Sequence, residues 1–148
     1  MKKMLAAAAA LSMLGLATHV WAGGQQVVAQ VSADGQSIVV RTYRCGTPAS
    51  LSLSGTAFGL VNGERRTLAL EARPGGEPGV FNVARQWPSE GRWALVFGVS
   101  NGKGEVSSLV VLEPGSPLRI ADQRMTFDRP SAERIDNALA KGTPVASR

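Results

Sequence analysis

The sequence predicts an all-β protein of about seven short antiparallel strands, arranged as a sandwich or barrel, with one short helix near the C-terminus. Two patterns lead to this prediction. Asp-Gly or Asn-Gly pairs at residues 34–35, 62–63 and 101–102 separate strand-like runs, and such pairs favour the positive φ angles of tight hairpin turns. The runs alternate apolar and polar residues, which is typical of strands with one buried face.

The first 22 residues have the parts of a secretory signal peptide. Lys2 and Lys3 form a positive start, residues 4–16 are apolar and rich in alanine, and Val-Trp-Ala at 20–22 ends the segment with small residues at both peptidase positions. The alternative is an uncleaved membrane anchor, but the apolar run is shorter than the roughly 20 residues that a spanning helix needs. We therefore expect cleavage between Ala22 and Gly23.

This expectation divides the chain into three segments. Residues 1–22 form the signal peptide, residues 23–128 the β-sandwich domain, and residues 129–148 a helix and tail. No later run is long and apolar enough to cross a membrane. The sequence thus predicts a periplasmic or secreted domain with no transmembrane segment after cleavage.

Charge argues against nucleic acid as a partner. The chain has 16 basic residues, so 14 remain without Lys2 and Lys3, against 11 acidic ones, for a net charge of about +3. Most of these cations are arginines scattered along the chain, and Arg65-Arg66 is the only adjacent pair. A nucleic-acid binder needs a clustered basic face with aromatic residues among it.

The strands follow from the turns and the alternation. We expect them at residues 25–33, 36–44, 50–61, 64–72, 80–86, 92–100 and 105–113. In the third strand Leu53 and Phe58 are five residues apart, so a regular strand would point them to opposite faces. One extra residue between them would bring both apolar side chains to the same face. Gly55 is the expected position of a β-bulge, unless the strand breaks there.

The stretch QWPSEGRW at residues 86–93 predicts a corner where the chain crosses between two sheets. Pro88 lacks an N–H and ends strand pairing. Trp93 shares a strand face with Leu95 and Phe97 and is expected inside, where truncating an aromatic costs about 3–5 kcal/mol. The alternative is a stacking platform for a sugar or other ligand, above all at Trp87, and this alternative requires the Trp87 ring to be exposed.

Beyond the last main strand, residues 117–127 predict one more edge strand or hairpin. Ile135, Ala138 and Leu139 follow at helical spacing and predict a short helix over residues 132–140. Ser131 is the expected N-cap and Gly142 the expected stop.

Residues 55–99 resemble the small periplasmic domains of the YtkA-like and CopC-like kind. The shared features are a polar-apolar strand pair, a Pro/Gly loop, the sequence GVFNV, and PSEGRWALVFGV leading into an alternating strand. The resemblance implies an immunoglobulin-like β-sandwich in the cell envelope. Its copper-handling members bind the metal through histidine and methionine. Because His19 lies in the signal segment and Met125 is the only later methionine, no metal ligand or cofactor is predicted here.

The residue types also argue against catalysis, so no catalytic residue is predicted. Without histidine in the cleaved chain, Ser-His and Cys-His nucleophile pairs are impossible. Lys103 and Lys141 are expected to be exposed to solvent, where burial does not activate the amine as a base. Among the acidic residues, Glu90 in the corner turn is the strongest candidate for a catalytic role.

Cys45 is the only cysteine of the chain, and an unpaired thiol is unusual in an exported protein. Three interpretations remain open. It is a buried small hydrophobic residue, it bridges two chains as a disulfide-linked homodimer, or it is a redox or partner-linking thiol whose pKa the neighbouring Arg44 lowers.

The sequence therefore predicts an exported, non-catalytic immunoglobulin-like domain that binds or supports another cell-envelope component, most simply a protein. The alternative is a small-ligand carrier, or a copper-trafficking-related domain that lacks the usual ligands. For a carrier, the expected contacts lie around the corner: Trp87, Glu90, Arg85 and Arg92.

Overall fold

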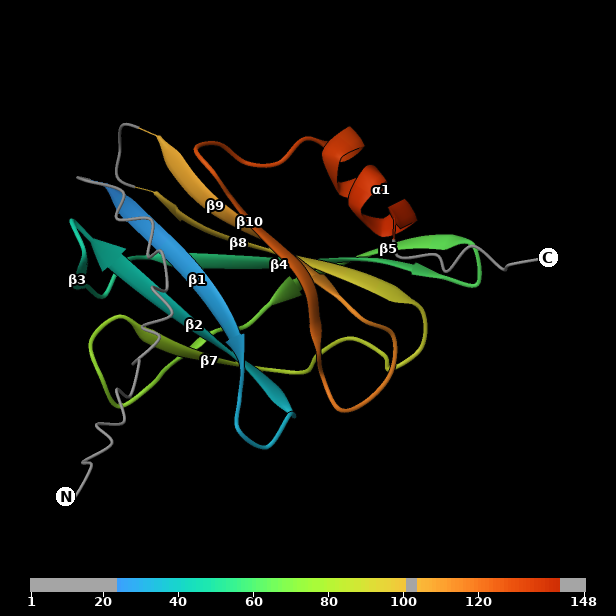
Figure 1. Cartoon of the computed structure of the whole chain (residues 1–148), viewed down its shortest axis with the longest axis horizontal. Coiled ribbons are helices and arrows are strands. Elements are labelled where there is room, and N and C mark those ends of the chain that lie inside the picture. Colours follow the sequence, from blue (N-terminus) through green and yellow to red (C-terminus); the bar gives the residue numbers. More distant parts are fainter. Residues whose placement is uncertain (1–23, 101–103, 142–148) are drawn as a thin grey trace, which may run out of the picture.

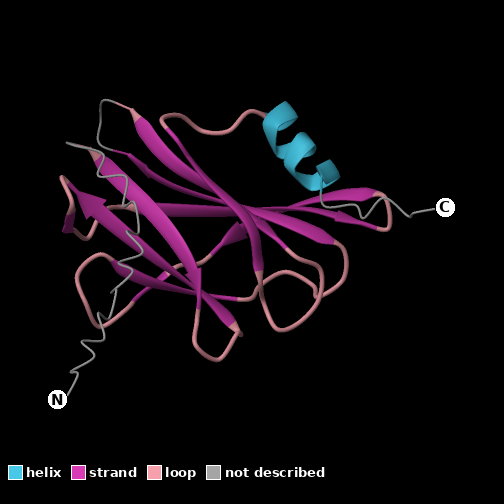
Figure 2. Cartoon of the chain, in the orientation of Figure 1, coloured by secondary structure: helices cyan, strands magenta, loops and turns pink. Residues whose placement is uncertain are grey.

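Two antiparallel sheets pack face to face, with one helix on the outside of one of them (Figure 1). The computed structural model describes residues 24–100 and 104–141. The expected signal peptide and cleavage point, the Asn101-Gly102 turn, Lys103 and the expected helix stop Gly142 lie outside these residues. The predicted all-β sandwich with a short C-terminal helix is confirmed, as the strand colouring of Figure 2 makes plain.

The described residues form ten strands, of which β3 and β6 have only two residues each. The strands are β1 (Gln25–Val31), β2 (Ser37–Arg44), β3 (Thr47–Pro48), β4 (Leu53–Val61), β5 (Glu64–Leu70), β6 (Arg73–Pro74), β7 (Val80–Ala84), β8 (Arg92–Ser100), β9 (Glu105–Leu112) and β10 (Ile120–Thr126), and the helix is α1 (Ala132–Lys141).

The strand order is that of an immunoglobulin-like sandwich. The first sheet runs β1-β2-β7-β6, with β3 paired to β2, and the second runs β10-β9-β8-β4-β5. If β1, β2, β6 and β7 are strands A, B, D and E, the first sheet has the order ABED, and β9, β8, β4 and β5 give GFCC′ in the second. Strand β10 and helix α1 are additions that follow the last immunoglobulin strand.

One of the predicted two-residue hairpin turns is confirmed. Asn62 and Gly63 connect β4 to β5 with φ angles of 52° and 80°, as a type I′ turn requires. At Asp34-Gly35 the predicted hairpin does join β1 to β2, but its turn is longer than two residues. The Ser32 N–H donates to the Ser37 carbonyl at 2.9 Å, and of the pair only Gly35 has a positive φ, of 71°. The Ser32 hydroxyl donates to the Asp34 carboxylate at 2.5 Å. This bond, with a second from the Gln36 N–H, lowers the pKa of Asp34.

The expected β-bulge at Gly55 is wrong. Strand β4 pairs with β8 without a register shift from Leu53 opposite Val99 to Leu60 opposite Arg92. The apolar residues change parity because both faces of the second sheet are covered, one by the first sheet and the other by α1. Phe58 thus packs on the helix side, although it has the parity that an ordinary one-sided strand would expose.

Between the sheets, small residues of β4 lie opposite large residues of β8. Gly55 pairs with Phe97, Ala57 with Leu95, and Gly59 with Trp93. A Cβ atom at Gly59 would lie 2.5 Å from the Trp93 ring, so the indole lies directly over the glycine. The predicted inward face of β8 is confirmed, since Trp93, Leu95, Phe97 and Val99 all belong to this core.

Helix α1 packs on the outer face of the second sheet. Ile135 and Leu139 are buried against a small group of sheet residues. That group consists of Ala94, Val96, Leu109 and Phe58. The predicted N-cap is confirmed, because the Ser131 hydroxyl accepts the Arg134 N–H at 3.3 Å. An ion pair between Arg65 of β5 and Asp136 adds a contact at the surface.

A glutamine side chain links the edge strands on one open side of the sandwich. Gln123 of β10 accepts the Ala29 N–H of β1 at 2.7 Å and donates to the Ala29 carbonyl at 3.0 Å. Its oxygen also accepts the Ser108 hydroxyl at 3.1 Å. The amide thereby supplies both bonds that a neighbouring strand would give to Ala29, and it occupies an edge that would otherwise be open to pairing.

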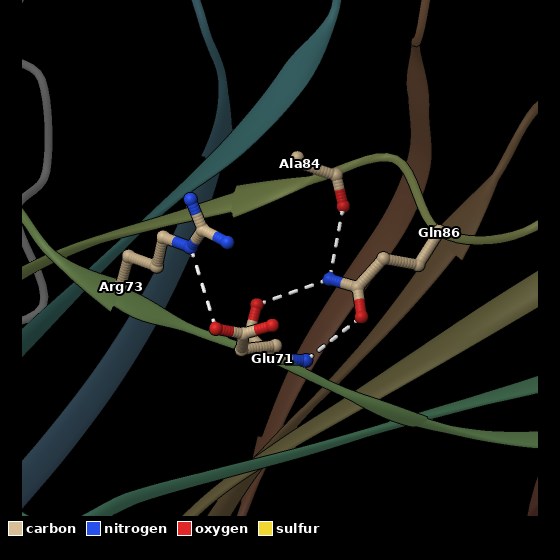
Figure 3. Close-up of polar contacts among 4 residues, drawn as sticks. All are labelled: Glu71, Arg73, Ala84 and Gln86. Carbon is tan, nitrogen blue, oxygen red and sulfur yellow. Dashed lines mark hydrogen bonds and ion pairs between the residues drawn. The ribbon is translucent and has the colours of Figure 1, made fainter.

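On the opposite open side of the sandwich, the side chain of Gln86 makes a similar link between the two sheets (Figure 3). Gln86 accepts the Glu71 N–H at 2.9 Å and donates to the Glu71 carbonyl at 3.0 Å and the Ala84 carbonyl at 3.2 Å. Arg73 donates to the Glu71 carboxylate at 3.3 Å. Since Glu71 lies between β5 and β6, this cluster fixes the point where the chain leaves the second sheet for the first.

Candidate functional site

The predicted corner exists, because the chain crosses from β7 in the first sheet to β8 in the second. Trp93 is 2 % exposed, and its indole N–H donates to the Glu90 carbonyl at 2.9 Å. Gly91 has a φ of 81°, a conformation that glycine adopts without strain. The corner thus fixes Trp93 as a structural residue at the end of the core.

Trp87 is buried, which contradicts the alternative that its ring is an exposed stacking platform. Its side chain is 3 % exposed and lies in the core between the sheets. Leu118, from the segment between β9 and β10, belongs to the same core and is far away in sequence. A ring in this position offers no face at the surface for a sugar to stack on.

Arg85 ties the corner to a distant loop. Its guanidinium donates to the carbonyls of Trp87 at 3.2 Å, Pro88 at 3.0 Å and Gly115 at 3.1 Å. It also lies 6.0 Å from the centre of the Trp87 ring, within reach of a cation–π contact. Backbone carbonyls thus account for the position of this side chain.

Arg92 faces a different element. It donates to the Leu139 carbonyl at 2.9 Å, near the C-terminal end of α1, where a cation is favoured by the helix dipole. The corner does not bring Arg92 together with Arg85 around one ligand, and the side chain of Glu90 is exposed. A role of these three residues in ligand contact stays a prediction.

Cys45 is exposed, so its interpretation as a buried residue is wrong. Strand β2 ends at Arg44, and Cys45 and Gly46 form the two-residue turn to β3, with φ angles of 51° and 76°. A turn residue at a hairpin tip points away from the core whatever its parity along the strand. The homodimer and the partner-linking thiol stay predictions.

Within the described residues the one thiol and the one thioether are on different sheets, Cys45 directly after β2 and Met125 within β10. Among residues 24–100 and 104–141 no group of three or more His, Cys, Asp or Glu side chains could hold a metal ion. No helix within that part of the chain is long and apolar enough to cross a membrane.

A groove between α1 and β10 is a feature that the sequence does not predict. It lies on the outer face of the second sheet and has a volume of about 380 Å³. In Figure 1 the chain passes from β10 through a loop to α1. Leu109 and Val111 of β9 form its apolar floor, since they face the same side of the sheet as the helix.

Cations from both elements line this groove, which we call the α1–β10 groove. Arg124 contributes from β10, and Arg134 and Lys141 from α1, against the single carboxylate of Asp122. Asp122 bonds the Arg124 Nε at 3.0 Å. The helical spacing of the two α1 cations is visible in the sequence, but only the fold brings Arg124 opposite them.

Comparisons with models of known protein families, with curated proteins and with solved structures find no match to this chain. What it binds must be inferred from its own residues.

Proposed function

We propose that the chain is exported as a non-catalytic immunoglobulin-like domain that binds another component of the cell envelope, and that the partner occupies the α1–β10 groove. The groove is the observation that carries this proposal. It combines an apolar floor with cations from two elements, and its volume of about 380 Å³ falls within the range of ligand sites.

Export is supported by the sequence of residues 1–22 and by the resemblance of residues 55–99 to small periplasmic domains. Binding is favoured over catalysis because both arginines of the tryptophan corner are engaged in the fold itself. Arg85 and Arg92 hold backbone carbonyls, and the chain has no histidine after residue 19.

Export and covalent state can be tested by a native mass spectrum of protein recovered without reductant from a bacterial periplasm. The mass of residues 23–148 is expected. A mass that retains the first 22 residues would contradict export by a cleaved signal peptide. A doubled mass that halves on reduction would assign Cys45 to a homodimer bridge.

The binding site can be tested by photo-crosslinking in the same cells. A benzophenone amino acid at Asn137, which lines the groove, is expected to give an adduct of one defined mass. The matched control is the same amino acid at Ser52, which is exposed and lies outside the groove. Equal adducts at both positions, or none at either, would contradict the proposal.

A small-ligand carrier is the second candidate, because the volume of the same groove also suits a small molecule. An added mass of a few hundred daltons in the native spectrum, lost on denaturation, would favour this alternative. An added copper ion that disappears in Cys45→Ser would instead favour the copper-trafficking alternative.

A further inference from the structure

We infer that the α1–β10 groove takes an extended acidic peptide segment of a partner protein. This inference rests on the proposed function and specifies the chemistry of the partner. It depends on how the donors are spaced along the groove, on what holds them, and on what lies between them.

The donors of the helix form a row. Arg134, Asn137 and Lys141 line the groove and are three and seven residues apart, so they lie on one face of α1. Seven residues of helix correspond to about 10.5 Å of rise. In an extended peptide, side chains on one side recur about every 6.6–6.8 Å. The backbone positions of Arg134 and Lys141 are thus about 4 Å further apart than two carboxylates two residues apart in such a peptide. The long arginine and lysine side chains can span this difference, whereas a single small carboxylate would engage only part of the row.

The opposite wall carries the third cation. Arg124 pairs in register with Leu109, so it projects on the same side of the sheet as the groove floor. Its partner Asp122 is half exposed, and the Arg134–Asp128 pair, at 3.9 Å, is also exposed. Such surface pairs contribute little to stability and are screened by salt. Both arginines can therefore exchange these carboxylates for those of a ligand.

The apolar floor of the α1–β10 groove favours a ligand that also carries apolar side chains. Leu109 and Val111, with Ala138 of the helix, line the groove between the cations. A chain with alternating acidic and apolar residues would place short apolar side chains on this floor, while longer glutamate side chains reach the walls. Charge and apolar contact together distinguish this ligand from a simple polyanion.

The test uses a fluorescein-labelled Glu-Val-Glu-Val-Glu peptide and its Gln-Val-Gln-Val-Gln counterpart, with fluorescence anisotropy on the exported full chain. The acidic peptide is expected to bind about tenfold more tightly than the amide peptide, and the difference should shrink at about 0.3 M NaCl. The double variant Arg134→Gln with Lys141→Gln should weaken the binding of the acidic peptide by about tenfold.

The matched control is Arg66→Gln with Arg119→Gln, which removes the same charge from exposed positions outside the groove. This pair should change the affinity by no more than about twofold. An equal loss of affinity in the two double variants would overturn the inference, because the peptide would then be attracted by the overall charge of the protein and not by the groove. Absence of binding at about 1 mM protein, or competition by hexanoate as strong as by the unlabelled peptide, would also overturn it.

The two proposals fail separately. A crosslink at Asn137 without peptide binding would leave the binding function in place and refute the acidic segment as its ligand. Loss of the crosslink as well would refute the groove as the binding site.

Discussion

Cys45 has a backbone conformation that its side chain does not favour. It occupies the first position of a two-residue hairpin turn, with a φ of 51°. The Asn62-Gly63 hairpin has asparagine at the same position, with a φ of 52°. Asparagine tolerates this left-handed region better than most residues, whereas other side chains crowd the backbone there.

Replacing Cys45 with asparagine should therefore stabilise the protein. We expect Cys45→Asn to raise the free energy of unfolding by about 0.5–1 kcal/mol, as relief of the left-handed strain suggests. Urea unfolding in the presence of reductant measures this, since reductant removes any contribution of a dimer. Cys45→Val is the control and should lower stability, because a β-branched residue is least tolerated at positive φ. A loss of stability in Cys45→Asn would show that the thiol makes a favourable contact.

At the scale of the strand, β4 and β8 pack closely because small residues of β4 lie opposite large side chains of β8. Gly59→Ala should lower the free energy of unfolding by about 1–3 kcal/mol, the usual cost of overpacking. The new methyl group would lie 2.5 Å from the Trp93 ring, and that ring is held by its bond to Glu90. Urea unfolding measures the change.

Gly104→Ala is the matched control for this substitution. A Cβ there meets no atom within 4 Å and the residue has no positive φ, so only the small entropic gain of replacing glycine remains. Equal effects of the two substitutions would mean that the Trp93 ring moves aside without cost.

Removing the side chain of Gln123 should lower the free energy of unfolding more than removing that of Gln86. Gln123→Ala leaves the Ala29 N–H and carbonyl and the Ser108 hydroxyl without their partner, in a partly buried place. We expect a loss of about 1–3 kcal/mol, and faster hydrogen exchange of the Ala29 amide. Gln86→Ala, whose bonds are exposed, should cost less than about 1 kcal/mol because water replaces the lost partner. The reverse ranking would contradict a structural role of the Gln123 bridge.

Local patterns in the sequence are enough to predict many elements. The Asn62-Gly63 turn, the Ser131 cap and the inward face of β8 each depend on residues close together in the chain, and each is confirmed. The wrong predictions have another cause. A bulge at Gly55 is expected only if one face of β4 is open to water, and no residue near β4 in sequence shows that a distant helix covers that face.

The site illustrates the same limit. The sequence leaves the exposure of Trp87 open, because nothing near it in the chain reveals that distant residues such as Leu118 belong to the same core. Cys45 has the same parity as Arg41 and Tyr43, which lie on the less buried face of β2, and it lies one residue beyond the end of that strand. The α1–β10 groove depends on β10 and α1 both packing beside β9, an arrangement that no short stretch of sequence encodes.

At the scale of the whole molecule, two apolar cores of unequal size share the second sheet. The larger lies between the two sheets and contains Trp93, Leu95 and Phe97. The smaller lies under α1 and is built around Ile135 and Leu139. Strand β8 contributes to both, which is why seven consecutive residues from Trp93 to Val99 are buried. An element held only by the smaller core should open more easily than the sandwich.

Leu139→Ala tests this hierarchy. Truncating a buried leucine costs about 2–5 kcal/mol, and we expect the loss to fall on the docking of α1, because Leu139 packs only in the smaller core. Native-state hydrogen exchange of the α1 amides should accelerate by at least about tenfold, while the amide of Leu95 in β8 keeps its protection. Phe97→Leu, in the larger core, is the control and should reduce protection in both regions. If Leu139→Ala reduces the protection of Leu95 as much as that of α1, the helix and the sandwich unfold as one unit, and the wall of the α1–β10 groove is as stable as the fold itself.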